Sequence, residues 1–376
     1  MEKVNYKYPF YRKRFILPLI LAVCSFILSQ YAAGHPHWTE SFYSLFLYPK
    51  IKSIIGFIPS LLPFSFFEIL IVTIICFLVF VIISFFNKKK DATKNRKFML
   101  SQFIVNLISI ICMIYFLFTL TCGLNYYRYP FSYSANYQVQ KTNDNSLNDL
   151  ENLLLDLADK LNDNYQEFNY EDKQDFFSFY GDESITAIEN LSTEYPMFNQ
   201  IAYSKPKPLI SSKLFSKAGI GGIFFPFTFE SNINTDIPNY LIPATMIHEL
   251  AHQAGFMRED EAHFIAYLAC INSDNKSLRY SGNFLAFHQG ITLLEKEDIT
   301  KYNNVVSLLS EDVNHDFNSY EAYLEDNKGL LQKISNKAND LYLKSNKQKN
   351  GINDYSQMVQ LVLAHYQKEN KALKTK

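Results

Sequence analysis

The chain has 376 residues, with 36 basic and 37 acidic side chains and a formal net charge of −1. This balance leaves no excess of positive charge for binding phosphates, so we expect no nucleic-acid partner. Phe and Tyr occur 33 and 26 times, which suits a membrane region followed by one folded domain, and the length leaves room for both.

Three apolar runs occupy much of the first third of the sequence, at about 15–32, 66–86 and 98–122. Each is long enough to cross a lipid bilayer as a helix. A cleaved signal peptide is the alternative for the first run, but no clear small-residue cleavage site follows it. The sequence therefore predicts a membrane region at 1–122 with three transmembrane helices, whose partner is the lipid bilayer.

Basic residues set the predicted orientation of these helices. They cluster before the first run and in the loop at 87–97, whereas the loop between the first and second runs holds only Lys50 and Lys52. By the positive-inside rule, the N-terminus and the 87–97 loop are cytoplasmic. Three crossings then predict a multi-pass membrane protein with an extracytoplasmic domain at 123–376.

The connection at 33–65 is apolar and interrupted by prolines. We expect it to form short amphipathic helices in the membrane interface. His35 and His37 stand on either side of Pro36. A metal site is one interpretation of this pair, and an interfacial turn is the more common one.

The 123–376 domain begins with an aromatic juxtamembrane stretch and two predicted helices, one with leucines in helical period from Leu147 to Leu161 and one over 171–191. A glycine-rich stretch from Gly219 to Glu230 then predicts a strand or hairpin. Its glycines at 221 and 222 would let an extended peptide backbone approach. A glycine-rich structural loop is the alternative.

A His-Glu-Leu-Ala-His run begins at His248 and has the pattern H-E-x-x-H. Pro243 suits the first turn of a helix and Gly255 suits its end. Residues i and i+4 lie on one helical face, so His248 and His252 can bind one metal ion. Glu249 stands beside the first ligand, where it can serve as general base. This arrangement is typical of zinc hydrolases.

The third metal ligand is expected from a second helix that follows a tight turn at Gly255. Three alanines on this helix form a narrow stripe that would pack against the first helix. At about 100° per residue, Glu259 falls near that stripe and Glu261 is displaced by more than a quarter turn. We therefore prefer Glu259 as the third ligand, with Glu261 as its rival.

The rest of the sequence predicts further helices at roughly 283–296, 301–311, 316–345 and 354–369. Tyr280 and His288 are candidates to stabilise an oxyanion. Each also has a common structural interpretation, as a packed aromatic residue or as a histidine on a helix face.

The pattern Glu259-x-x-Ala262-His263-x-x-Ala266 resembles the third-ligand helix of gluzincin metallopeptidases, with His263 in place of the usual Asp or Asn. That position normally braces a metal ligand through a hydrogen bond. The resemblance therefore implies a bracing role for His263. A further metal ligand or a surface histidine are the alternatives.

The chain also resembles one family across most of the sequence after about residue 200 and in its N-terminal membrane layout. The matching segments are Phe-Pro-Phe and Glu-Ser-Asn within 225–232, Pro243 to Gly255, Arg258-Glu-Asp-Glu-Ala, Arg279-Tyr-Ser-Gly, and Gly351-Ile-Asn-Asp-Tyr with Leu361-Val-Leu-Ala. The family is that of the bacterial membrane proteins of domain of unknown function 3810. The resemblance implies a zinc peptidase of the bacterial cytoplasmic membrane and specifies no substrate.

Together these features predict a mainly α protein: N-terminal transmembrane helices, then a helical zincin-like domain with a small strand or hairpin before the active-site helix. The predicted function is a membrane-anchored zinc metallopeptidase acting on a peptide or protein. Zn²⁺ would be held by His248, His252 and Glu259, with Glu249 as general base. The alternatives are a non-catalytic zinc-binding sensor or scaffold, and a zinc hydrolase of a non-peptide envelope component.

Overall fold

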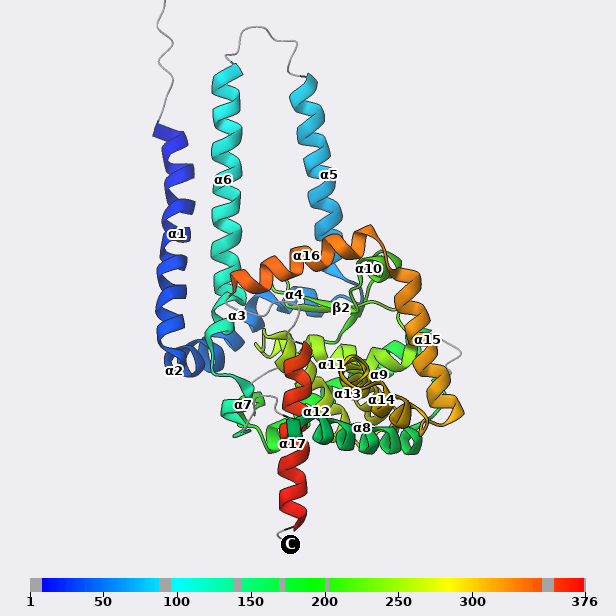
Figure 1. Cartoon of the computed structure of the whole chain (residues 1–376). Helices are drawn as coiled ribbons and strands as arrows, with labels where there is room; N and C mark the ends of the chain where they lie inside the picture. Colours follow the sequence, from blue (N-terminus) through cyan, green and yellow to red (C-terminus); the bar gives the residue numbers. More distant parts are fainter. Residues whose placement is uncertain are drawn as a thin grey trace, which may run out of the picture.

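Three long helices, α1 (Pro9–Gly34), α5 (Phe66–Asn87) and α6 (Arg96–Thr121), project from the same side of the molecule (Figure 1). The computed structural model describes residues 9–87, 96–137, 144–168, 173–199, 203–346 and 355–374. Within these residues the protein is mainly helical, as predicted.

Two segments of these helices, Phe15–Gly34 and Ser101–Thr121, are long and apolar enough to cross a membrane, and Phe66–Val81 is a shorter apolar stretch. Among the side chains that the structure describes in these three segments, most are exposed or half-buried, which supports membrane association. The number of crossings and the orientation stay predictions. Many of the basic residues behind that orientation, including 3, 7 and 88–94, lie outside the described residues.

The connection between α1 and α5 forms short helices, as expected. These are α2 (Pro36–Trp38), the π-helix η1 (Thr39–Leu47), α3 (Tyr48–Ile55) and α4 (Phe57–Ser60). The connection also packs on the following domain, because the fully buried rings of Tyr43 and Tyr48 share a cluster with Phe229 and Leu124. The Tyr48 hydroxyl donates to the backbone carbonyl of His252 at 3.3 Å.

The body of the domain is a set of helices around one large hydrophobic core. They are α8 (Asp144–Asn164), α9 (Lys173–Asn190), α11 (Ile242–Gln253), α12 (Glu259–Ile271), α13 (Lys276–Glu297), α14 (Ile299–Val306), α15 (Glu311–Asn327) and α17 (Tyr355–Lys374). Shorter turns are η3 (Gly123–Tyr127), α7 (Phe131–Ser134), η4 (Leu191–Thr193), η5 (Pro196–Phe198) and η6 (Asn239–Leu241). The periodic leucines of α8 point into the core, which is why that helix was predictable.

Helices α11, α12 and α13 pack closely at the centre of the core. A Cβ atom at Gly282 would lie 2.3 Å from the Cβ of Cys270, so α13 can cross α12 only with glycine at this position. The predicted start of this helix at 283 is too late. The helix begins at Lys276 because the Asn275 side chain accepts a hydrogen bond from the N–H of Ser277 and caps it.

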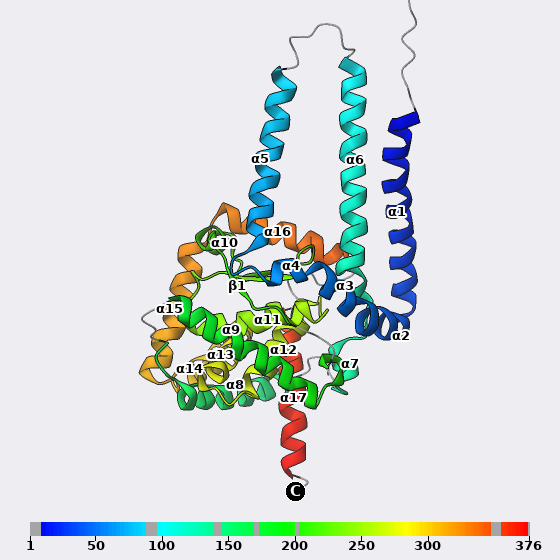
Figure 2. The same ribbon diagram turned by 180° about the vertical axis from the view of Figure 1, so that it is seen from behind.

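The single helix expected over 316–345 is two helices in the structure. Helix α15 ends at Asn327, and α16 (Leu330–Ser345) begins after Gly329. Helix α16 crosses the face of the domain from which α5 and α6 project (Figures 1 and 2).

A small sheet holds β1 (Lys207–Pro208), β2 (Gly222–Phe225) and β3 (Glu230–Ile233) in the order β1-β3-β2. Strand β1 is parallel to β3, and β2 is antiparallel to it, with Phe224 opposite Ser231. The hairpin expected before the metal-binding helix is therefore present. Strand β3 is buried against α11, where the Ser231 hydroxyl donates to the carbonyl of Glu249 at 2.9 Å, and β2 is an edge strand. Helix α10 (Ser212–Ala218) precedes the hairpin.

The foot of α5 is fixed to this sheet by the buried carboxylate of Glu230. It accepts the backbone N–H groups of Phe66 and Phe67, both at 2.9 Å, and pairs with the buried Lys207 ammonium at 2.6 Å. These N–H groups belong to the first turn of α5 and have no partner within the helix. The sequence analysis divides the chain at residue 122 into a membrane region and a domain. In the structure, residues from both sides of that boundary pack against each other.

Candidate metal centre

Helix α11 presents the two histidines of the H-E-x-x-H motif, and both of its ends form as the sequence indicates. Pro243 lies in the first turn, and the Ser281 hydroxyl accepts the backbone N–H of Ala244 at 3.0 Å. The helix ends at a left-handed glycine, Gly255, with φ of 85°. The chain then turns back and starts α12 at Glu259.

Three side-chain groups converge between α11 and α12. The Nε2 atoms of His248 and His252 are 3.1 Å apart. The Glu259 carboxylate lies 3.3 Å from Nε2 of His248 and 3.7 Å from Nε2 of His252. A tetrahedral zinc ion with bonds of about 2.0 to 2.1 Å holds its ligand atoms about 3.3 to 3.4 Å apart. These three groups therefore fit zinc in both chemistry and spacing.

The His252 ring is held in the orientation that a metal ligand needs. Its Nδ1 lies 2.7 Å from the carbonyl oxygen of Phe256, just beyond the turn at Gly255. Such a contact fixes the tautomer and leaves Nε2 free to coordinate. Burial alone would lower the pKa of His252, but the adjacent Glu259 carboxylate outweighs that effect and raises it to about 9.

The predicted general base, Glu249, lies beside the two histidines and is only 3% exposed. Burial raises the pKa of its carboxyl group. The neighbouring imidazoles of His248 and His252 oppose this rise, and so does a hydrogen bond from the backbone N–H of Phe224 in strand β2. Its Oε2 has no hydrogen-bond partner among the described residues. A buried carboxylate oxygen without a partner is costly for stability alone.

Strand β2 reaches this carboxylate only because Gly222 has no side chain. A Cβ atom at Gly222 would lie 2.6 Å from Oε1 of Glu249, whereas at Gly221 the nearest side-chain atom, from Thr245, would be 3.7 Å away. The sequence singled out both glycines for a substrate's approach. In the structure, Gly222 makes room for the carboxylate of Glu249.

The two rival glutamates have different positions. Glu259 faces the histidines, as the helical phase predicted. Glu261 is buried on another side of α12, where its carboxylate accepts the N–H of Phe131 and the guanidinium of Arg258, both at 2.9 Å. Glu261 therefore fixes the start of α12, and it is not among the groups that converge on the two histidines.

His263, one turn after Glu259, also borders the site. Its ring centroid is 4.1 Å from that of His248. His248, Glu259 and His263 offer ligand atoms that all lie within 4.8 Å of one another. This position suits a residue that braces His248 as well as one that supplies a further ligand atom.

The other candidates from the sequence lie elsewhere. Tyr280 is fully buried and donates to Asp316 at 2.7 Å, and His288 lies 2.8 Å from Glu321. Neither meets the histidines of α11, so we do not assign them an oxyanion role. Nδ1 of His35 lies 2.8 Å from the backbone carbonyl oxygen of Tyr31 in α1. This local contact suits an ordinary turn at the end of a helix.

Sequence reasoning missed two tyrosines near the candidate ligands. The hydroxyl of Tyr126 donates to that of Tyr342 in α16 at 2.8 Å. Burial raises the pKa of Tyr126, and the Glu259 carboxylate adds to that effect. Tyr126 belongs to the stretch that the sequence marks as aromatic and juxtamembrane, and nothing in that pattern points to a metal site. The sequence around Tyr342 gives no indication that it lies near Tyr126, because that proximity depends on how α16 packs on the domain.

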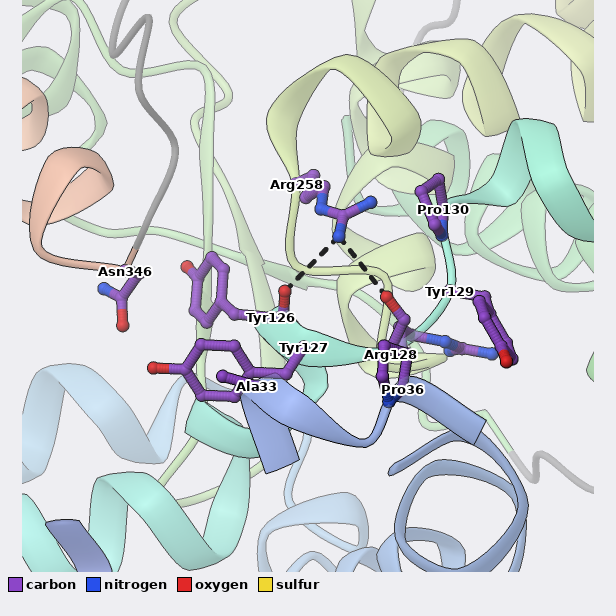
Figure 3. Close-up of a pocket in the computed structure, with 9 residues that line it drawn as sticks. All are labelled: Ala33, Pro36, Tyr126, Tyr127, Arg128, Tyr129, Pro130, Arg258 and Asn346. Carbon is purple, nitrogen blue, oxygen red and sulfur yellow. Dashed lines mark hydrogen bonds between the residues drawn. The ribbon is translucent and has the colours of Figure 1, made fainter. Parts of the chain in front are cut away.

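A pocket of about 260 Å³ lies next to the start of α12 (Figure 3). Arg258 points into it and donates to the carbonyl oxygens of Tyr126, at 3.4 Å, and Arg128, at 3.3 Å. Arg128 in turn forms a buried ion pair with Glu40 at 2.6 Å. Arg258, the residue before Glu259, is therefore fixed by hydrogen bonds to the backbone that lines this pocket.

Comparisons with known proteins give a family and no closer relative. No curated protein and no solved structure matches the chain. The profile of the family described as protein of unknown function DUF3810 matches residues 43–363, from η1 to α17, and so includes the whole candidate metal centre. The chain therefore belongs to the DUF3810 family.

Proposed function

We propose that this protein is a membrane-anchored zinc metallopeptidase with a zincin-like domain of gluzincin type. The observation that carries the proposal is the convergence of two imidazole Nε2 atoms and one carboxylate at 3.1 to 3.7 Å. Beside them stands a buried carboxylate with an oxygen that lacks a partner among the described residues. Ligand set and base together match the requirements of hydrolysis.

His248, His252 and Glu259 would hold the zinc ion. Zinc bound there would act as a Lewis acid toward the scissile carbonyl and would lower the pKa of water. Glu249 would accept the proton of the attacking water and deliver it to the leaving amine.

Strand β2 supports a peptide as the substrate. It is an edge strand of the sheet and its residues are half-buried. Its outer backbone groups, apart from the N–H of Phe224 that contacts Glu249, would be the ones to pair with a further strand. An extended peptide paired with this edge would run past Glu249, which the N–H of Phe224 contacts. Pairing through the backbone would fix the scissile bond with little demand on the side-chain sequence.

A zinc scaffold without catalysis is the second candidate, and His263 is the observation that favours it. Structural zinc sites are closed by four protein ligands, whereas catalytic sites keep one position open. The ring of His263 lies 4.1 Å from that of His248, so it is near enough to be considered as a fourth ligand. In that case the unpartnered oxygen of Glu249 would have no function.

Elemental analysis of the full-length protein in detergent tests zinc binding, which both candidate functions require. We expect zinc after purification without chelator, and its loss in His252→Ala. His288→Ala is the matched control, because it removes a histidine on α13 that lies beside Glu321, and it should keep the metal. Wild-type protein without metal, or equal metal content in both variants, would contradict the proposal.

A further inference from the structure

Helix α16 carries its apolar side chains on the face that points away from the domain. Leu330, Ile334 and Leu341 are 74%, 56% and 62% exposed. Their spacing of four and seven residues puts them on one stripe of the helix. Helices on the surface of a globular domain normally turn such a stripe toward the core.

The opposite face of α16, toward the domain, is largely polar. Gln332, Ser335 and Asn339 are half-buried there, and Leu343 is the buried apolar residue of the helix. A Cβ atom at Gly219 would lie 3.0 Å from the Gln332 side chain, so this face packs closely where it meets the end of α10. The apolar stripe therefore faces outward because α16 packs on the domain through its opposite, largely polar face.

Neighbouring elements expose apolar side chains at the same level. Ile58 of α4 and Leu214 of α10 are 66% and 59% exposed. Leu61, the residue after α4, and Ile210, two residues before α10, are more exposed still. Both views of the molecule show α3, α4, α10 and α16 as one layer at the foot of α5 and α6 (Figures 1 and 2). The layer is therefore continuous with the helices that have membrane-like composition.

Lysines lie along one edge of the apolar stripe. Lys333, Lys337 and Lys344 are exposed and fall within a quarter turn of one another on α16. A helix with an apolar face bordered by lysines is typical of segments that lie in the plane of a membrane surface with anionic headgroups.

We propose that α16, together with α4 and α10, lies on the surface of a lipid bilayer, with its apolar stripe turned toward the acyl chains. We choose a bilayer as the partner of this surface because the layer adjoins the foot of α5 and α6, the long apolar helices that project from the domain (Figure 1). The contact goes beyond the proposed peptidase function and does not depend on zinc. It fixes which side of the domain faces the membrane, and Tyr342 of α16 connects that side to the candidate metal centre through Tyr126.

Fluorescence quenching by brominated lipids tests this contact in the full-length protein. The chain has one tryptophan, so Trp38→Phe gives a silent background into which Leu341→Trp or Ile334→Trp is introduced. Leu308→Trp is the matched control. Leu308 is 47% exposed and lies two residues after the end of α14, a helix that lies away from the foot of α5 and α6 (Figure 1). All variants are placed in nanodiscs of dibromo-phosphatidylcholine with phosphatidylglycerol and compared with nanodiscs of the unbrominated lipids.

We expect bromine to quench the tryptophans at 334 and 341 several-fold more strongly than the one at 308. Equal quenching at the three positions would overturn the proposal. A second copy of the chain on this face would instead give weak quenching and a blue shift of the stripe tryptophans that grows with protein concentration, and that result would also overturn it. The three positions are exposed, and circular dichroism and the Tm of each variant, compared with Trp38→Phe, show whether the fold is kept.

Discussion

Gly222→Ala tests whether strand β2 positions the general base. The new Cβ would lie 2.6 Å from Oε1 of Glu249, and ordinary contact begins at 3.4 Å. The carboxylate must therefore withdraw by the difference, about 0.8 Å, or the strand must shift by as much. Gly222 does not have a positive φ, so alanine adds no backbone strain and the effect is confined to this contact.

A displacement near 1 Å in a catalytic group costs about 100-fold in rate, which corresponds to about 2.7 kcal/mol of transition-state stabilisation. We expect Gly222→Ala to lower kcat by about that factor and to leave KM and the zinc content close to those of the wild type. The zinc is unaffected because Glu249 is not one of the expected ligands. Peptide hydrolysis by the purified full-length protein, followed at several substrate concentrations, separates kcat from KM.

Gly221→Ala is the matched control for this prediction. Its Cβ would meet the side chain of Thr245 at 3.7 Å, an ordinary contact, so the variant should behave like the wild type. If the two alanine variants hydrolyse peptide at the same rate, Glu249 is not held by the close approach of β2. A loss of zinc in Gly222→Ala alone would show that the strand supports the metal ligands instead.

Three further predictions, two of them with a matched control, test the site and the contact between α5 and the sheet. Glu249→Gln should keep zinc and lower hydrolysis by about two to four orders of magnitude, since the amide accepts no proton; unchanged activity would favour the zinc scaffold. Glu259→Gln should weaken zinc binding, whereas Glu261→Gln should retain the metal in the same elemental analysis. The opposite outcome would exchange the roles of the two glutamates. Lys207→Met should destabilise the protein by about 3 to 5 kcal/mol, because it leaves a buried carboxylate without its cation. Lys205→Met, which breaks an exposed pair with Asp182, should cost about 0 to 1 kcal/mol in the same denaturation experiment.

Local periodicity was enough to predict the elements that carry the candidate site. The spacing of His248 and His252 and the helical phase of Glu259 depend only on the geometry of one helix and one short turn. Pro243 and Gly255 likewise bound α11 through their own backbone preferences. These features could be read from the sequence because the residues that determine them lie within a few positions of one another.

Contacts between distant parts of the chain could not be predicted in this way. Tyr48 reaches the carbonyl of His252 across 204 positions, and the hydroxyl of Tyr280 is bound by Asp316 on a different helix. Each tyrosine has the same local pattern whether its hydroxyl meets a substrate or a structural partner. The outward stripe of α16 was equally hidden, since its periodicity fits a helix that faces a core as well as one that faces lipid.

Glu230 and its neighbour Ser231 give α5 and α11 a common support. The carboxylate of Glu230 accepts the first N–H groups of α5, and the hydroxyl of Ser231 donates to the backbone carbonyl of Glu249. Strand β3, which carries both residues, is paired with β1 on one side and with β2 on the other. The apolar helix α5 and the helix that carries the two histidines are therefore anchored on consecutive residues of one strand, so the position of either helix constrains that of the other.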